Sequence, residues 1–88
     1  MSEISRELER LASLDQRSLR LELTRLRERP PSAGRDAMLG MVLLRLSMLS
    51  AGPEAERYFV SGYSYSRTSR DPSVRKVAEE LRARFDLL

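Results

Sequence analysis

A nearly continuous apolar stretch in the middle of an 88-residue chain is the feature that most constrains the fold. From Ala37 to Leu49, apolar side chains would point in every direction around a helix axis, and Arg45 is the single charge among them. A helix that is apolar on all sides is normally buried on all sides. The stretch therefore predicts a central helix over about residues 36–50, covered by other helices or by a second copy of the chain.

The segment before it, residues 2–29, carries leucines at helical spacing. This pattern fits either one long helix or two shorter ones. Ser13 and Gln16 have the spacing of a capping box, which favours a second helix beginning at Leu14. Pro30-Pro31 ends this part, because proline lacks an N–H donor and restricts the residue before it.

Two further helices are predicted in the C-terminal part. Residues 53–68 start like a helix, but the region around Gly62 is poor helical material, so an extended conformation over residues 60–68 stays open. Asp71 and Pro72 are a favourable N-cap and first residue for a last helix, whose apolar stripe runs from Val74 to Leu88. The expected fold is all-α: a single domain of four to five short helices around the central one.

The residue types present argue against an enzyme. The chain has neither histidine nor cysteine, which supply most general bases, nucleophiles and transition-metal ligands near neutral pH. No Gly-rich phosphate loop is present, and no nucleophile lies beside a base. We therefore expect no catalytic, cofactor-binding or metal-binding residues and no small-molecule substrate. Without a signal-peptide pattern or a membrane-spanning stretch, the expected location is the cytoplasm.

The leading hypothesis is a non-enzymatic protein–protein interaction module, such as a small adaptor, chaperone or regulatory subunit, that also self-associates. A chain this short has little mass with which to cover an all-round apolar helix. Arg45 would either pair with a partner or extend to the helix edge with its stem on apolar surface. Methionines at positions 38, 41 and 48 suit an adaptable contact. The expected contact residues are Leu14, Leu21, Met41, Arg45, Met48, Tyr58 and Tyr65.

The alternative hypothesis is a nucleic-acid-binding regulator. Lys76 is the single lysine among 16 cationic residues, and arginine suits contacts to phosphate. The net charge is only +3, so charge alone does not predict such a partner. Tyrosines interleaved with arginines could stack bases and track a backbone. The residues expected for this role are Arg17, Arg20, Arg27, Arg35, Tyr63, Tyr65, Arg67 and Arg70.

One segment adds to this alternative. A leucine helix over residues 19–26, a Pro/Ser/Gly link over residues 28–35 and a second leucine-bearing helix follow one another. This order loosely resembles the helix–extension–helix motif of small nucleic-acid-binding modules, which would imply phosphate contacts from the link. Asp36 stands where that motif usually has a second basic residue, and the second helix leaves little polar surface.

Overall fold

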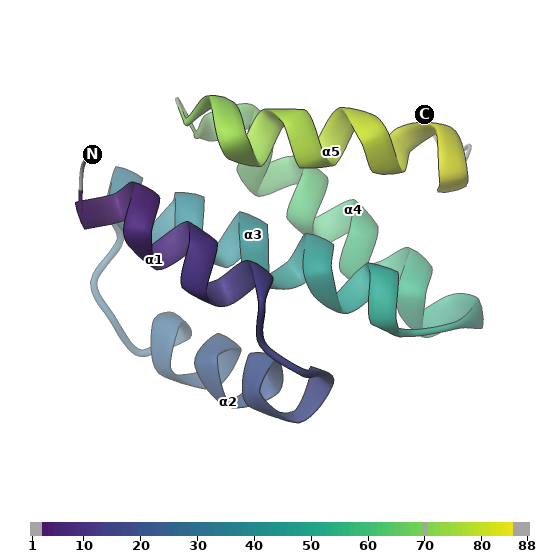
Figure 1. Cartoon of the computed structure of the whole chain (residues 1–88), viewed down its shortest axis with the longest axis horizontal. Helices are drawn as coiled ribbons and strands as arrows, with labels where there is room; N and C mark the ends of the chain where they lie inside the picture. Colours follow the sequence, from purple (N-terminus) through teal and green to yellow (C-terminus); the bar gives the residue numbers. More distant parts are fainter. Residues whose placement is uncertain (1–2, 70, 86–88) are drawn as a thin grey trace.

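The computed structural model describes residues 3–69 and 71–85, with side chains from Arg6 onward. These residues form five α-helices and no strand, which confirms the all-α class (Figure 1). The helices are α1 (Glu3–Ala12), α2 (Gln16–Arg27), α3 (Ala33–Leu49), α4 (Gly52–Thr68) and α5 (Pro72–Phe85).

The N-terminal segment forms two helices, as its capping signals favoured, but the N-cap of the second helix is Asp15 rather than Ser13. Asp15 has extended backbone, and its carboxylate accepts a 2.8 Å hydrogen bond from the Ser18 N–H at the start of α2. Ser13 instead donates its hydroxyl to the Arg10 carbonyl at the end of α1, at 2.8 Å. The predicted start at Leu14 is therefore wrong, because the Ser13 side chain is already used by the preceding helix.

The proline link is fixed by residues on both sides of it. Ser32 caps α3 by accepting a 3.0 Å hydrogen bond from the Arg35 N–H, so the helix begins at Ala33, earlier than predicted. The Arg35 guanidinium donates to the Arg29 carbonyl at 3.1 Å and lies 3.3 Å from the Asp36 carboxylate. The first turn of α3 thus holds the chain that leaves α2.

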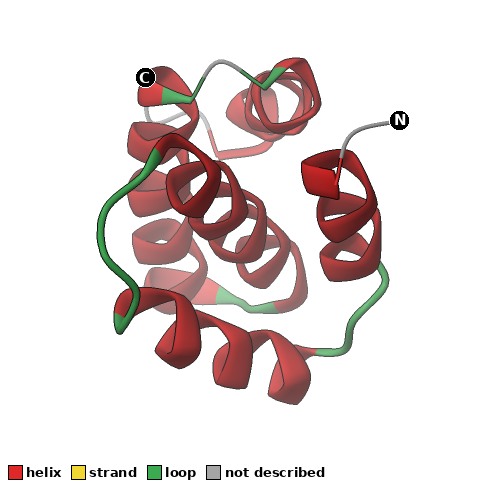
Figure 2. Ribbon diagram, turned by 90° about the vertical axis from the view of Figure 1, so that its left-hand side faces the viewer, coloured by secondary structure: helices red, strands yellow, loops and turns green. Residues whose placement is uncertain are grey.

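Helix α3 lies in the centre and packs against each of the other four helices, as its apolar sequence predicted. Figure 2 shows α1 and α4 on opposite sides of it, with α5 above and α2 below. Leu39, Val42, Leu44 and Leu46 are at most 1 % exposed. All five helices contribute apolar side chains to this core. Removing these side chains from water is the main contribution that stabilises the fold.

Close approach of α3 and α4 depends on glycine. A Cβ atom at Gly62 would lie 2.9 Å from the Leu44 Cγ and 3.0 Å from the Leu44 backbone nitrogen. Gly62 therefore marks the contact between the two backbones, and α4 remains helical through Thr68. The extended alternative for residues 60–68 is wrong, because packing against α3 outweighs the low intrinsic helix propensity of this stretch.

Helix α5 matches its sequence signals and closes the bundle. The Asp71 carboxylate accepts a 2.9 Å hydrogen bond from the Ser73 N–H, as expected of an N-cap. Phe85 stacks on Phe59 of α4, with ring centroids 4.8 Å apart. Leu88, the predicted end of the apolar stripe, lies outside the described residues. Within the described part of the chain, none of the helices is both long enough and apolar enough to cross a membrane.

Candidate functional site

The candidate site is one face of α3, formed by Met38, Met41, Arg45 and Met48, which we call the methionine face. These residues are spaced by three or four positions, so they lie on the same side of the helix. Met41 is only 4 % exposed, whereas the other three are half-buried. The face therefore reaches the surface along both of its ends while Met41 anchors it in the core.

The position of this face follows from Gly40. A Cβ atom there would lie 3.0 Å from the Val74 Cγ1 of α5 and 3.4 Å from the Tyr65 Cβ of α4. Each residue of a helix is turned by about 100° from the one before it. Met41 and Arg45 are therefore turned by about 100° and about 140° from the direction of Gly40, away from its contact with α4 and α5.

Arg45 is poorly satisfied on this face. Its Nη1 donates to the Met48 Sδ at 3.4 Å, and its Nε is buried without a hydrogen-bond partner. A thioether sulfur is a weak acceptor. No carboxylate of the described residues lies within 4.0 Å of the guanidinium. A buried donor without an acceptor costs about 1–3 kcal/mol, so the intramolecular contacts do not explain why arginine stands here.

Arg35 provides a comparison for Arg45, because it is a second enclosed arginine in α3. Arg35 also has a buried Nε without a partner, but its two terminal nitrogens bind the Arg29 carbonyl and the Asp36 carboxylate. Its positive charge therefore has a counter-charge within the chain. Arg45 has none among the described residues, so the two enclosed arginines differ in whether the chain itself balances their charge.

The expected contact residues do not form one surface. Arg45, Met48 and the buried Met41 share the methionine face, and Leu14 packs against the core from the link between α1 and α2. Leu21 is 55 % exposed on α2, on the side opposite its buried leucines.

The two expected tyrosine contacts lie on α4. Tyr58 and Tyr65 are half-buried and seven positions apart, so they share one side of that helix. Tyr65, with Asp36 and Val60, lines an open depression of about 550 Å³ between the first turn of α3 and α4. None of the four residues of the methionine face lines this depression.

The residues expected for nucleic acid are mostly engaged or dispersed. Arg20 pairs with Glu54 of α4 at 3.1 Å, and Arg35 holds the proline link. Arg17 and Arg27 are exposed on α2, which lies on the opposite side of α3 from α5 (Figure 1). Arg70 lies outside the described residues. The structure therefore does not gather these arginines on one continuous surface.

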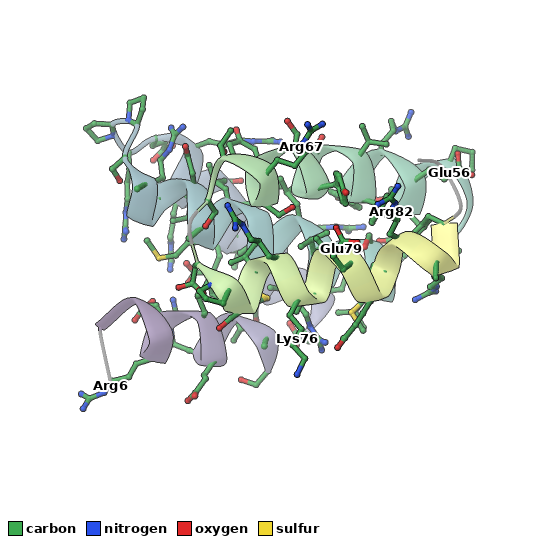
Figure 3. All side chains as sticks on the ribbon, turned by 90° about the horizontal axis from the view of Figure 1, so that it is seen from above. Arg6, Glu56, Arg67, Lys76, Glu79 and Arg82 are labelled. Carbon is green, nitrogen blue, oxygen red and sulfur yellow. The ribbon has the colours of Figure 1, made fainter. Side chains whose placement is uncertain are left out.

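Tyr63 and Arg67 do come together, in an open groove of about 290 Å³ between α4 and α5. The Tyr63 hydroxyl donates to the Glu79 carboxylate at 3.2 Å. Figure 3 shows that Glu79 and Arg82 point from α5 toward the α4 side, and these two lie 3.7 Å apart. Because a carboxylate lies in the groove, the groove is mixed in charge rather than basic.

Sequence reasoning missed this polar contact between helices. Arg75 and Glu79 look like an intrahelical pair at helical spacing, whereas Arg75 donates its Nε to the Ser69 carbonyl at 3.1 Å, and Glu79 binds Tyr63. No local pattern specifies these partners, because they depend on how α5 packs against α4.

Two ionisable groups have shifted pKa values, and both shifts arise from structural contacts. Hydrogen bonds from Arg10 to Glu7 and then to Glu22 raise the pKa of the Arg10 guanidinium and join α1 to α2. The backbone N–H of Ser18 lowers the pKa of the Asp15 carboxyl. In the described part of the chain no three acidic side chains gather as a metal site would require.

No protein-family model, curated protein or solved structure matches this chain. The function is therefore inferred from the arrangement of its own residues.

Proposed function

We propose that this chain is a non-enzymatic protein–protein interaction module that binds a partner chain on the methionine face of α3. The observation that carries the proposal is Arg45, a half-buried cation with one weak contact, set among methionines. Methionine side chains adapt to irregular partner surfaces, and arginine is enriched at the centres of protein interfaces. A role as adaptor, chaperone or regulatory subunit would use this face in the same way.

A partner of different sequence fits this face better than a second copy. Symmetric dimers bring the same patch of both subunits together. A two-fold axis through the methionine face would place two Arg45 guanidinium groups near one another, and like charges across an interface are repulsive. Self-association through this face therefore remains the less favourable form of the proposal.

The test is a pull-down from native lysate with three forms of the full chain: wild type, Met48→Glu and Val60→Glu. Met48→Glu places a charge on the methionine face, whereas Val60, 52 % exposed on α4, provides a matched control elsewhere. Circular dichroism confirms that each form is helical. We expect one stoichiometric protein to bind wild type and Val60→Glu after nuclease treatment and to be lost from Met48→Glu.

Two results would contradict the proposal. Proteins that disappear after nuclease treatment would indicate binding through nucleic acid, and this binding should weaken steeply with salt because phosphate contacts release counterions. Equal capture by wild type and Met48→Glu would place the interaction on another surface.

A further inference from the structure

We infer that the element that binds the methionine face is an acidic amphipathic helix, whose Asp or Glu side chain pairs with Arg45 between two apolar anchors. This inference rests on the proposed function and specifies the chemistry of the partner.

The charge of the partner follows from the unmet hydrogen-bonding capacity of Arg45. A guanidinium carries five N–H donors, and among the described residues only one of them has a partner, the weakly accepting sulfur of Met48. The Nε is enclosed by the protein itself, so the terminal nitrogens are the part that an outside acceptor can reach. A carboxylate is the acceptor that matches guanidinium in charge and geometry.

The paired arginines of the described residues support this assignment. Arg10, Arg20, Arg25, Arg35 and Arg82 each have a carboxylate within 2.9–3.7 Å, supplied by an adjacent residue, a neighbouring turn or another helix. Arg45 is more enclosed than the exposed members of that group, and yet no described acid approaches it. The missing counter-charge is therefore expected from a partner, and the net charge of +3 favours an acidic one at long range.

The helical form of the partner follows from the shape of the surface. Met38 and Met48 lie on either side of Arg45 along α3, about 15 Å apart at the rise of a helix. A ligand must offer apolar, acidic and apolar groups in that order over this length, as a helix does on one side with residues at i, i+7, and i+10 or i+11. An extended ligand would leave its backbone donors and acceptors unpaired, because the described elements are all helices and offer no strand edge.

The experiment selects binders from a phage-displayed library of helical peptides. Each peptide has two randomised apolar anchors and one central position that is Glu, Asp, Lys, Gln or Ala. The full chain is used as wild type, Arg45→Gln and Arg45→Glu, with Met48→Glu to map the face. Affinities of selected synthetic peptides are then measured by fluorescence anisotropy.

We expect wild type to enrich Glu or Asp at the central position. Replacing that acid with Gln in a selected peptide should weaken binding about tenfold. This measurement uses unaltered protein, so it does not depend on how any variant folds. Arg45→Gln should remove the preference for an acid, Arg45→Glu should reverse it toward Lys, and Met48→Glu should abolish binding.

Several outcomes would overturn the inference. Peptides that bind the methionine face with no preference for an acid would leave the proposed function intact but remove the acidic partner. The inference of a helical partner at this face would be wrong if no peptide were enriched. It would also be wrong if the enriched peptides bound equally well to the Arg45 and Met48 variants. A dimer in sedimentation velocity that Met48→Glu dissociates would make the occupant a second copy of the chain. Failure of the proposed function itself is decided separately by the lysate pull-down.

Discussion

Gly62 of α4 and Leu44 of α3 lie so close that a Cβ atom at position 62 would be 3.0 Å from the Leu44 backbone nitrogen. A flexible side chain can move away from such a contact, but the backbone of a central helix cannot do so without displacing its neighbours. The two helices therefore depend on the absence of a side chain at this position.

Gly62→Ala is expected to lower the free energy of unfolding by about 1–2 kcal/mol, measured by urea denaturation. Alanine gains up to about 1 kcal/mol of helix propensity, and overpacking costs about 1–3 kcal/mol, so the loss should dominate. Ser61→Ala, at an exposed neighbouring position, should change stability by less than about 0.5 kcal/mol. A more stable Gly62→Ala protein would show that α3 and α4 can separate at no cost.

Gly40→Ala should behave differently, because only a side-chain atom lies within 3.0 Å of its added Cβ, whereas at Gly62 a backbone nitrogen lies equally close. The Val74 Cγ1 would lie 3.0 Å from the new methyl group, and Val74 is fully buried. We expect a loss of about 1 kcal/mol in wild type and a smaller loss in a Val74→Ala background, where space is available. A double-mutant cycle measures this coupling. Additive effects would mean that the two residues are not in steric contact.

The sequence identified the elements whose signals are local. Asp71 and the stripe beginning at Val74 define α5 because a cap and a 3.6-residue period need only neighbours in the chain. The central helix was equally clear, because a helix that is apolar on all sides is stable only when it is buried. The sequence indicated that Gly62 weakens α4. This was wrong, because glycine at this position allows close packing against Leu44, which is distant in the sequence.

The candidate site was predictable only in part. Arg45 is conspicuous as the one charge in an apolar helix, and Met48 lies beside it at helical spacing. The sequence could not show whether these two residues share a surface with Leu21 and Tyr58. Tertiary packing decides which sides of α2 and α4 face solvent. The structure separates these residues onto different surfaces.

Asp15 should make stability depend on pH at the start of α2. Its backbone hydrogen bond with Ser18 favours the ionised carboxyl and lowers its pKa below the usual 3.8. A group with a depressed folded-state pKa contributes stability above its unfolded pKa, and that contribution is lost as pH falls through the folded pKa. The difference in melting temperature between wild type and Asp15→Asn should therefore shrink below about pH 4.

Two comparisons complete this test. Asp15→Asn keeps an acceptor for the Ser18 N–H and should remain capped, whereas Asp15→Ala should melt at a lower temperature at neutral pH. Parallel melting curves for wild type and Asp15→Asn at all pH values would mean that the carboxylate charge plays no part in the cap.

Arg35→Lys should destabilise the link between α2 and α3 even though the charge is retained. The guanidinium reaches two acceptors, the Arg29 carbonyl at 3.1 Å and Asp36 at 3.3 Å, and its side chain is 16 % exposed. One ammonium group cannot reproduce this planar arrangement, so we expect a loss of about 1–2 kcal/mol in urea denaturation. Arg29→Lys, which leaves that carbonyl in place, should change stability by less than about 0.5 kcal/mol. Equal effects would refute a specific role for Arg35.

Arg45→Met should stabilise the isolated chain by about 1 kcal/mol while removing partner binding. Methionine keeps the apolar stem against α3 and eliminates the buried Nε that has no acceptor, so the cost of burying that donor is removed. Arg20→Met is the matched control, since Arg20 is an exposed arginine already paired with Glu54 and should be nearly neutral. Thermal denaturation and the lysate pull-down are measured on the same preparations. A less stable Arg45→Met protein would mean that the arginine serves the fold, whereas a more stable one that no longer binds would mean that it serves recognition.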